Sequence, residues 1–252
     1  MPVLVTGATG CVGRALIPKL VESGGQVRVY VRRDVPEYRK LGVHVAIGEA
    51  DHEGRIESAL EQVHTLVHLV GGPSPEPVVP SVWLNLTSTE VALRAAENAE
   101  VRRFLFLSPI GADPASDHPY LADKGKAEAA IRASSLEHAI FRCSPIWAPG
   151  SVLEHFLERG GKSQARMNPV AVADVAAALV AADTRDGELR GTWELGGPDV
   201  LTVDELAKRM DMKRRTFPPR IAPRLVSLYQ QDQIADPAEA VRQFGLAQTP
   251  VA

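Results

Sequence analysis

The stretch Met1-Pro-Val-Leu-Val-Thr-Gly-Ala-Thr-Gly-Cys-Val-Gly13 decides the fold. An apolar run leads directly into Gly7, Gly10 and Gly13, and a helical pattern follows over residues 14–21. Gly7 permits a tight turn, Gly10 lets backbone N–H groups approach a diphosphate, and Gly13 lets the helix pack closely. A glycine triplet alone is also typical of a flexible turn. The strand before it and the helix after it favour a dinucleotide site, with the anion at the helix N-terminus.

Composition limits the classes of protein to which this chain can belong. Its 252 residues fit one large α/β domain, or one domain with a small lobe. The net charge of -3 gives no reason to expect a nucleic-acid partner. Cys11 and Cys143 have neither a metal nor a redox spacing, and the scattered histidines do not suggest a metal site. With no basic start before a long apolar stretch, and only a short apolar run at 175–182, we expect a cytoplasmic protein without a membrane span.

Strands and helices alternate along the first part of the chain. Strands are predicted at 3–5, 26–31, 43–47, 65–70, 104–107 and 136–141, and helices at 14–21, 56–63, 86–98 and 124–134. This alternation is typical of an α/β protein with a doubly wound parallel sheet, the Rossmann fold. We therefore predict an NAD(P)-binding Rossmann domain over residues 1–145.

The pattern changes after Pro145. A helix is predicted at 170–182 with Asp174 as its cap, a strand at 192–195, and a helix at 202–210 capped by Thr202. The remainder contains Pro218, Pro219 and Pro223, and is expected to wrap the sheet or to form a small lobe. Residues 146–252 are thus predicted to be a small C-terminal substrate or cap region, an α/β lobe integrated with the same domain.

Several motifs resemble those of the extended and atypical short-chain dehydrogenase/reductases. They are the glycine motif at 6–13, Leu-Val-Gly-Gly at 69–72, Asn85, Arg-Phe-Leu-Phe-Leu-Ser at 103–108, Tyr-Leu-Ala-Asp-Lys at 120–124, Phe-Arg-Cys-Ser-Pro at 141–145, 170–176 and Leu-Gly-Gly-Pro at 195–198. Their order and spacing match over about four-fifths of the chain. The chain is most similar to the atypical branch, which includes NmrA-like proteins and the NADPH-binding accessory subunit of respiratory complex I. Sugar-nucleotide epimerases are more distant relatives.

The end of the second strand bears on the choice of cofactor. NAD sites in such folds place an acid there for the ribose 2′-hydroxyl, but this chain has Arg32 and Arg33, and Asp34 comes one or two residues late. Two guanidinium groups could bind a 2′-phosphate bidentately, and Arg32 is the better placed. The two arginines could also be a solvated strand end. We predict NADP(H), with NAD(H) as the weaker alternative.

The resemblance implies further cofactor contacts. Glu49-Ala50 stands where relatives have an acid for the adenine amino group, although a register slip of two would bring Asp51 there. Cys11 could be a stabilised thiolate near the positive helix end, or simply a small wall residue. The resemblance implies contacts from Thr9 and Val12 in the glycine motif and from a wall beside the ribose and diphosphate formed by Leu69, Val70 and Gly71. It also implies contacts from three later residues, Ser108, Lys124 and Pro145.

The same resemblance places the catalytic chemistry on Tyr120 and Lys124. Positions four apart share one face of a helix, so both side chains can reach one point. In the family, the lysine binds the ribose and lowers the pKa of the tyrosine, whose phenol exchanges a proton with the substrate oxygen. Relatives also carry Ser or Thr where this chain has Pro109, which leaves Ser108 as an auxiliary donor. Asn85 resembles an asparagine that steadies a water or a backbone bend, or it is a plain helix-start residue.

Two functions of different class remain open. The first is an NADP-dependent oxidoreductase or epimerase-like enzyme acting on a small carbonyl or hydroxyl compound. The second is an NADPH-binding protein without turnover, a redox sensor or an assembly factor. Candidate pocket residues are Pro145, Ile146, Trp147 and Phe156. Because little more than twenty residues follow Trp147 before Pro169, we expect a small or medium apolar ligand, or a pocket open to a protein partner. A homo-oligomer also remains possible.

Overall fold

A computed structural model describes residues 2–73, 80–159, 161–210 and 223–251. Its centre is a parallel sheet of seven strands in the order β10-β6-β5-β4-β1-β2-β3. The strands are β1 (Val3–Thr6), β2 (Val27–Val31), β3 (His44–Ile47), β4 (Thr65–His68), β5 (Arg103–Pro109), β6 (Glu137–Cys143) and β10 (Arg190–Leu195). The strand order reverses between β1 and β4, the place where open α/β sheets bind ligands.

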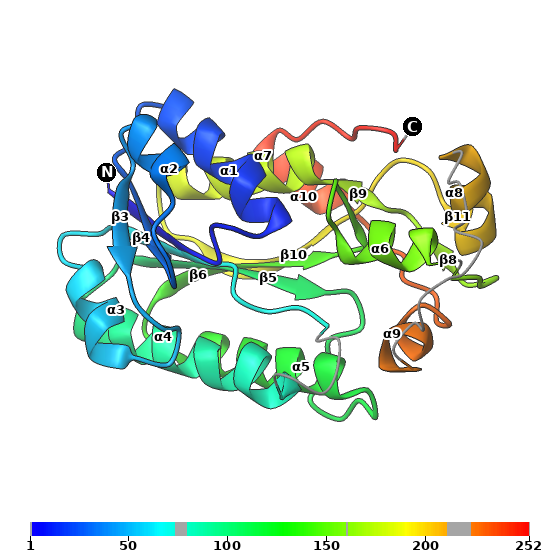
Figure 1. Ribbon diagram of the computed structural model, residues 1–252, viewed down its shortest axis with the longest axis horizontal. Coiled ribbons are helices and arrows are strands. Elements are labelled where there is room, and N and C mark those ends of the chain that lie inside the picture. Colours follow the sequence, from blue (N-terminus) through cyan, green and yellow to red (C-terminus); the bar gives the residue numbers. More distant parts are fainter. Residues whose placement is uncertain (1, 74–79, 160, 211–222, 252) are drawn as a thin grey trace.

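Helices cover both faces of this sheet (Figure 1). Above the sheet in that view lie α1 (Cys11–Glu22), α2 (Pro36–Lys40), α7 (Val172–Thr184) and α10 (Ala238–Phe244). Below it lie α3 (Glu53–Ala59), α4 (Ser88–Asn98) and α5 (Pro119–Ala133). Each face buries its own apolar cluster, because alternate side chains of a strand point to opposite faces. This arrangement is the doubly wound Rossmann fold.

The rest of the described chain forms a small lobe beyond the carboxyl ends of the strands. It contains α6 (Val152–Glu158), β8 (Arg166–Met167), β11 (Leu201–Thr202), α8 (Val203–Arg209) and α9 (Pro223–Leu228). β7 (Ile146–Trp147) pairs with β9 (Val170–Ala171) at its base. A third apolar cluster fills this lobe, so the lobe has a core of its own beside the sheet.

The C-terminal region contributes to both parts. β10 pairs with β6 along its whole length, and α7 packs on α1, so residues well beyond 145 complete the Rossmann sheet. The strand predicted at 192–195 is this seventh strand. Residues 211–222, which include Pro218 and Pro219, lie outside the described residues. No described helix is long and apolar enough to cross a membrane.

Helix ends are where the sequence predictions and the structure differ. α5 starts at Pro119, five residues before the predicted start, because proline suits the first turn of a helix. The helix predicted at 56–63 is α3, which ends at Ala59. A π-helical turn, η1 (Trp83–Thr87), precedes α4. Thr202 does cap α8, in a capping box with Glu205.

Asp174 is not the cap of α7, so this prediction was wrong. The N-cap position is Ala171, because residues 170–171 form β9 rather than the first turn of the helix. The carboxylate of Asp174 instead accepts hydrogen bonds from the backbone N–H (2.7 Å) and the hydroxyl (2.8 Å) of Thr249. Asp174 thus holds the C-terminal segment against α7.

Candidate functional site

The glycine motif forms a tight connection between β1 and α1. Gly7 has φ +67, and a Cβ there would lie 2.6 Å from the backbone carbon of Leu69. At Gly13 a Cβ would lie 2.4 Å from the carbonyl oxygen of Ala8, so the start of α1 rests directly on the loop. At Gly10 a Cβ would meet only the Gly7 oxygen, at 3.3 Å. Gly7 and Gly13 are thus required by the protein's own packing, whereas Gly10 keeps the first turn of α1 open toward the cavity.

Two side chains hold the loop from behind. The Tyr38 hydroxyl donates to the carbonyl of Ala8 at 2.6 Å, and the Arg14 guanidinium donates to the carbonyl of Thr9 at 2.7 Å. These bonds fix the loop, and the first backbone N–H groups of α1, which have no acceptor within the helix, can bind an anion. The cradle is therefore preorganised for a diphosphate.

Cys11 is a wall residue rather than a reactive thiolate. Its side chain is partly buried and lines the cavity. Burial raises the pKa of its thiol, and this effect outweighs the hydrogen bonding from the first turn of α1 and the charge of Arg14. Of the two interpretations of Cys11, the structure thus favours the wall residue, because desolvation opposes the electrostatics of the helix end.

A second hollow adjoins the glycine loop on the side of β2. It is lined by Thr9, Arg32, Arg33 and Glu49, among others. Asp34, the late acid, is paired with Arg39 at 2.9 Å, whereas Arg32 and Arg33 are exposed and make no ion pair among the described residues. The hollow thus places these two guanidinium groups beside Thr9, one of the predicted cofactor contacts.

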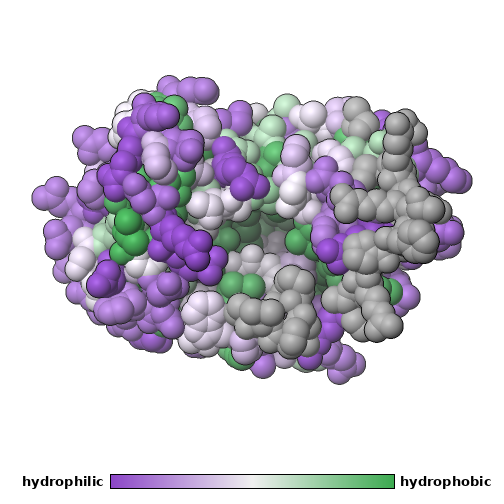
Figure 2. Space-filling model, in the orientation of Figure 1, coloured by the Kyte–Doolittle hydropathy of each residue, from purple (hydrophilic) through white to green (hydrophobic). Residues whose placement is uncertain are grey.

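The main cavity lies where the carboxyl ends of the strands meet the small lobe, and it appears as the hollow at the centre of Figure 2. It measures about 210 Å³. The glycine loop closes one side, α5 and the end of β5 another, and α6 with the segment after α9 the third. Most of its side chains are apolar, including Leu69, Leu107, Ile146, Val152, Leu153 and Leu228.

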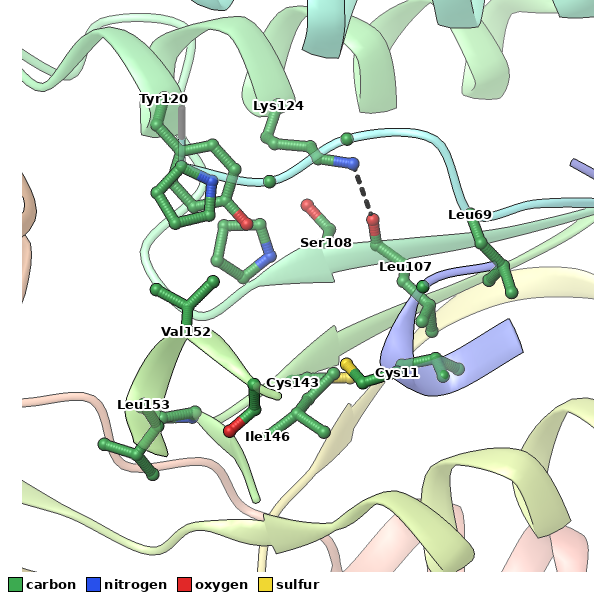
Figure 3. A pocket seen from close by; sticks show the side chains of 18 of the residues that line it. Cys11, Leu69, Leu107, Ser108, Tyr120, Lys124, Cys143, Ile146, Val152 and Leu153 are labelled. Atoms are coloured by element: carbon green, nitrogen blue, oxygen red, sulfur yellow. Dashed lines mark hydrogen bonds between the residues drawn. The ribbon is translucent and has the colours of Figure 1, made fainter. Parts of the chain in front are cut away.

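Tyr120 and Lys124 project from one face of α5 toward the end of β5 (Figure 3). The Lys124 ammonium donates to the carbonyl of Leu107 at 3.0 Å and lies 4.2 Å from the centre of the Phe106 ring. The Tyr120 hydroxyl has no hydrogen-bond partner among the described residues. One side chain is therefore fixed by the strand, and the other is available to a ligand.

Burial dominates the titration of both groups. It lowers the pKa of Lys124 to about 7, although the nearby Glu128 carboxylate acts in the opposite direction. It raises the pKa of Tyr120 above its usual value, with a smaller contribution from Cys143. The family resemblance implies a tyrosine pKa lowered by the lysine. In the folded protein burial raises the pKa of Tyr120 instead, so the phenol is protonated at neutral pH.

Asn85 shapes the wall beside Lys124. Its amide oxygen accepts from the N–H of Gly72 at 2.8 Å, and its amide nitrogen donates to the carbonyl of Gly72 at 3.1 Å. Gly71 has φ +137, and a Cβ there would lie 2.8 Å from the Lys124 nitrogen. Asn85 therefore steadies a backbone bend, one of the two roles predicted for it, and this bend passes close to the lysine.

Ser108 and Pro109 end β5 at the edge of the cavity. The Ser108 hydroxyl oxygen is enclosed by protein and has no hydrogen-bond partner. Pro109 has no side-chain donor. The position at which relatives carry a hydroxyl thus offers none here, and the neighbouring hydroxyl is shut off from the open part of the cavity.

The structure does not bring all the predicted pocket residues to the cavity. Pro145 and Ile146 line it, as do Leu69, Gly71 and Val12, whereas Val70 and Ala50 do not. Phe156 is 1% exposed and packs in the lobe core at 4.5 Å from the Tyr229 ring. Trp147 also packs against the lobe core. Both aromatics thus pack in the lobe core and not in the cavity wall predicted for them.

Sequence reasoning missed the wall contributed by the lobe. Val152, Leu153, Leu228, Tyr229 and Gln233 line the cavity. No short motif marks these residues, because they come from segments far apart in the sequence that meet only in the folded protein. Their one shared signal is their place in the predicted substrate region after residue 145.

A family model described as NAD(P)H-binding matches residues 7–185. Among curated proteins, the chain is 32% identical over 233 residues to the mitochondrial NADH dehydrogenase [ubiquinone] 1 alpha subcomplex subunit 9 of Arabidopsis thaliana, covering 85% of this chain and 58% of the relative. It is 31% identical over 150 residues to a ceramide reductase of Caulobacter vibrioides, covering 59% of this chain and 47% of the relative. The chain thus spans about half the length of these relatives.

Among solved structures, the fold is similar to that of MoeE5 in complex with UDP-glucuronic acid and NAD. The TM-score is 0.78 with 21% sequence identity, over 100% of this chain and 95% of that chain. At this identity the likeness concerns the fold alone. It agrees with the seven-stranded Rossmann sheet.

Proposed function

This chain belongs to the NAD(P)H-binding family of atypical short-chain dehydrogenase/reductases, and from that premise we propose that it is an NADP(H)-dependent oxidoreductase acting on a small apolar carbonyl or hydroxyl compound. One observation supports this most: Tyr120 and Lys124 project from α5 into an apolar cavity that the glycine loop closes on another side. A proton donor, a cation and an anion cradle therefore surround one space.

The residues around the cavity fit a nicotinamide dinucleotide. The first turn of α1, left open by Gly10, suits the diphosphate. Arg32 and Arg33 suit a 2′-phosphate, and Glu49, in the same hollow, is our candidate for the adenine amino group. Lys124, beside the bend at Gly71, suits the ribose hydroxyls of the nicotinamide half.

The bound dinucleotide would supply a hydride, two electrons and one proton, to the carbonyl carbon of a substrate. Tyr120 would give its hydroxyl proton to the carbonyl oxygen, so that the product is an alcohol, and would regain a proton from solvent. Because burial keeps the phenol protonated, this chain is set up as a general acid in the direction of reduction. The apolar walls would exclude water and hold the organic part of the substrate.

Titration of the purified protein with NADPH and NADH, followed by nucleotide fluorescence, tests the cofactor proposal. We expect NADPH to bind at least about tenfold more tightly, because a bidentate contact with a phosphate adds about 1.5 kcal/mol or more. Arg32→Ala should remove most of this difference and leave NADH binding unchanged. Equal affinities in the unsubstituted protein would contradict the 2′-phosphate argument.

A screen of aldehydes and ketones with NADPH, followed by absorbance of the reduced nicotinamide, tests turnover. Because the wall is apolar, aryl and medium-chain alkyl ketones are the compounds to try first. The name of the Caulobacter relative, ceramide reductase, agrees with an apolar compound as substrate.

A second function is favoured by one specific observation. The enclosed Ser108 hydroxyl and the proline at 109 leave the end of β5 without a donor for a substrate oxygen. A protein that binds NADPH and acts by contacting a partner would not need one, and the Arabidopsis relative is by its name a subunit of a larger assembly. NADPH binding without turnover across a broad panel would favour this redox-sensor or assembly role.

The compartment belongs to the same proposal. Cys11 and Cys143 are both free thiols, which agrees with the reducing cytoplasm expected from the sequence. The Arabidopsis relative is mitochondrial, and the mitochondrial matrix is also reducing. Localisation of the tagged protein in its own cells would distinguish the two.

A further inference from the structure

The cavity lacks a second hydrogen-bond donor at the place where relatives have one. An oxygen that gains negative charge during reduction is stabilised by preorganised donors, and each donor contributes substantially to the rate. Tyr120 supplies one. Pro109 supplies none, and the Ser108 hydroxyl is enclosed. A second donor must therefore come from another wall of the cavity.

Tyr229 stands on that other wall. It follows α9, lines the cavity and is 4% exposed. Its ring packs at 4.5 Å against Phe156 in the lobe core. Its hydroxyl has no hydrogen-bond partner among the described residues, and unlike that of Ser108 it is not enclosed by protein. A phenol that is fixed by its ring and unpaired at its oxygen is suited to receive a ligand.

The two phenols face one space. Tyr120 reaches the cavity from α5, and Tyr229 reaches it from the turn after α9. Burial raises the pKa of both, so both remain protonated donors at neutral pH. The His118 ring bonds to the carbonyl of Arg224 at 2.9 Å, and this contact ties α9 to the start of α5.

The segment after Tyr229 is fixed as well. Asp232 accepts from the backbone N–H (2.7 Å) and the guanidinium (2.9 Å) of Arg166. The buried Gln233 donates to the carbonyl of Leu228 at 2.9 Å, and its own carbonyl accepts from Ser144 at 2.8 Å. These bonds join the segment to the lobe and to the end of β6, so Tyr229 is positioned before any ligand arrives.

We propose that Tyr229 donates the second hydrogen bond to the substrate oxygen and that the substrate is an uncharged apolar ketone or aldehyde. This inference rests on the proposed oxidoreductase function. Tyr120 and Tyr229 approach the oxygen from different walls, while Ile146, Val152 and Leu153 contact the apolar part. Tyr229 is a substrate-binding residue in this scheme, and Tyr120 remains the group that transfers the proton.

The test uses acetophenone as the probe, with α-methylstyrene, whose methylene group replaces the carbonyl oxygen, as the matched control. Both are titrated by NMR into the full chain saturated with NADP⁺, so that no turnover is needed. Tyr229→Phe keeps the ring that packs on Phe156. We expect it to weaken acetophenone binding about 5- to 10-fold, the effect of one hydrogen bond, and to leave α-methylstyrene binding within about twofold.

Equal effects of Tyr229→Phe on the two probes would overturn the proposal, because Tyr229 would then be an apolar wall only. Failure of acetophenone to bind the unsubstituted protein that binds NADP⁺ would overturn the substrate class, and the cofactor site would stand. Failure of NADP⁺ itself to bind would instead contradict the proposed function. NADP⁺ affinity of Tyr229→Phe, expected to equal that of the unsubstituted protein, reports whether the variant is folded.

Discussion

Lys124 shows how a functional side chain can oppose the stability of its own fold. The ammonium group is almost fully buried, and its contacts with the Leu107 carbonyl and the Phe106 ring do not replace the water it has lost, since its pKa falls to about 7. A buried cation of this kind that faces a cavity is a candidate for binding a ligand. In our proposal that ligand is the ribose of the cofactor.

The pH dependence of stability checks this reasoning. Below pH 7 Lys124 is protonated in both states, and the folded state bears the full cost of the buried charge. Between pH 7 and 10.5 only the unfolded state keeps the proton, so stability rises with pH. With a pKa of about 7 in the folded state and 10.5 in the unfolded state, we expect the stability advantage of Lys124→Met over the unsubstituted protein to be about 4 kcal/mol larger at pH 6 than at pH 10. Urea unfolding of both proteins at the two pH values measures it, and a pH-independent difference would refute the buried charge.

Tyr120 and Lys124 should separate binding from turnover. Lys124→Ala should weaken NADPH binding about tenfold or more, because a charged donor to the ribose is lost. Tyr120→Phe should leave NADPH binding unchanged and reduce turnover about 100-fold or more, because the proton donor is lost. Fluorescence titration and initial rates with any ketone found active measure the two effects. An unaltered rate in Tyr120→Phe would remove the general-acid role.

At this scale, local spacing predicts some site residues and misses others. Tyr120 and Lys124 are four apart in a motif, which predicts that they meet, and the start of α5 at Pro119 places both on one helix. Tyr229 reaches the same cavity through the fold of the lobe. It lies 109 positions after Tyr120, and no sequence spacing predicts that two residues so far apart will meet. For Cys11 the sequence left a thiolate and a wall residue open, and burial, which raises the pKa of the thiol, favours the wall residue.

At the scale of elements, the glycines of the loop between β1 and α1 meet two separate requirements: Gly10 leaves room for the cofactor, and Gly13 lets α1 pack on the loop. Gly10→Ala adds a methyl group that meets only the Gly7 oxygen, at the N-cap of α1, where alanine costs about 1 kcal/mol. We expect NADPH affinity to fall at least about tenfold, because the methyl group enters the cradle. Gly13→Ala places a methyl group against the carbonyl oxygen of Ala8. We expect this variant to lose about 2 kcal/mol of stability in addition to any loss of NADPH affinity. Thermal unfolding measures the stability of each variant, and titration measures its NADPH affinity. Equal destabilisation of the two variants would contradict the separate roles of Gly10 and Gly13.

Strands were more predictable than helix ends for a physical reason. All seven strands lie within a few residues of the apolar runs in the sequence, because a parallel sheet buried on both faces needs continuous apolar segments. Helix ends depend on local competition. Pro119 starts α5 early, the bridge of Val170–Ala171 to β7 delays α7, and the π-helical turn before α4 replaces regular helix at Asn85.

At the scale of the whole molecule, the sheet is completed by chain that sequence reasoning assigned to the C-terminal region. β10 covers the edge of β6, and α7 buries apolar side chains against α1. Because β10 follows the lobe residues at 151–171, the site and the sheet cannot form independently. The sequence pattern alone indicated a strand at 192–195, but the partner of that strand is a matter of tertiary structure.

Arg103 joins these distant parts at the opposite end of the sheet from the cavity. Its side chain is fully buried at the start of β5 and donates to the Glu137 carboxylate. It also donates to the carbonyls of Ala182, Asp183, Arg185 and Gly187, at the end of α7 and in the loop before β10. One guanidinium group thus satisfies the carbonyl groups that α7 leaves unpaired and fixes the entry to the seventh strand.

Arg103→Met should therefore reduce the free energy of unfolding by about 3 kcal/mol, because it leaves several buried carbonyls without a donor. Arg102→Met is the matched control: Arg102 bonds to the same Glu137 carboxylate at 2.8 Å, but its side chain is 46% exposed, so we expect a loss below about 1 kcal/mol. Urea unfolding at neutral pH measures both. Since the cavity lies at the other end of the sheet, NADPH affinity below the transition should be unchanged in both variants. Equal losses of stability would show that the ion pair, and not the capping of α7, is what Arg103 contributes.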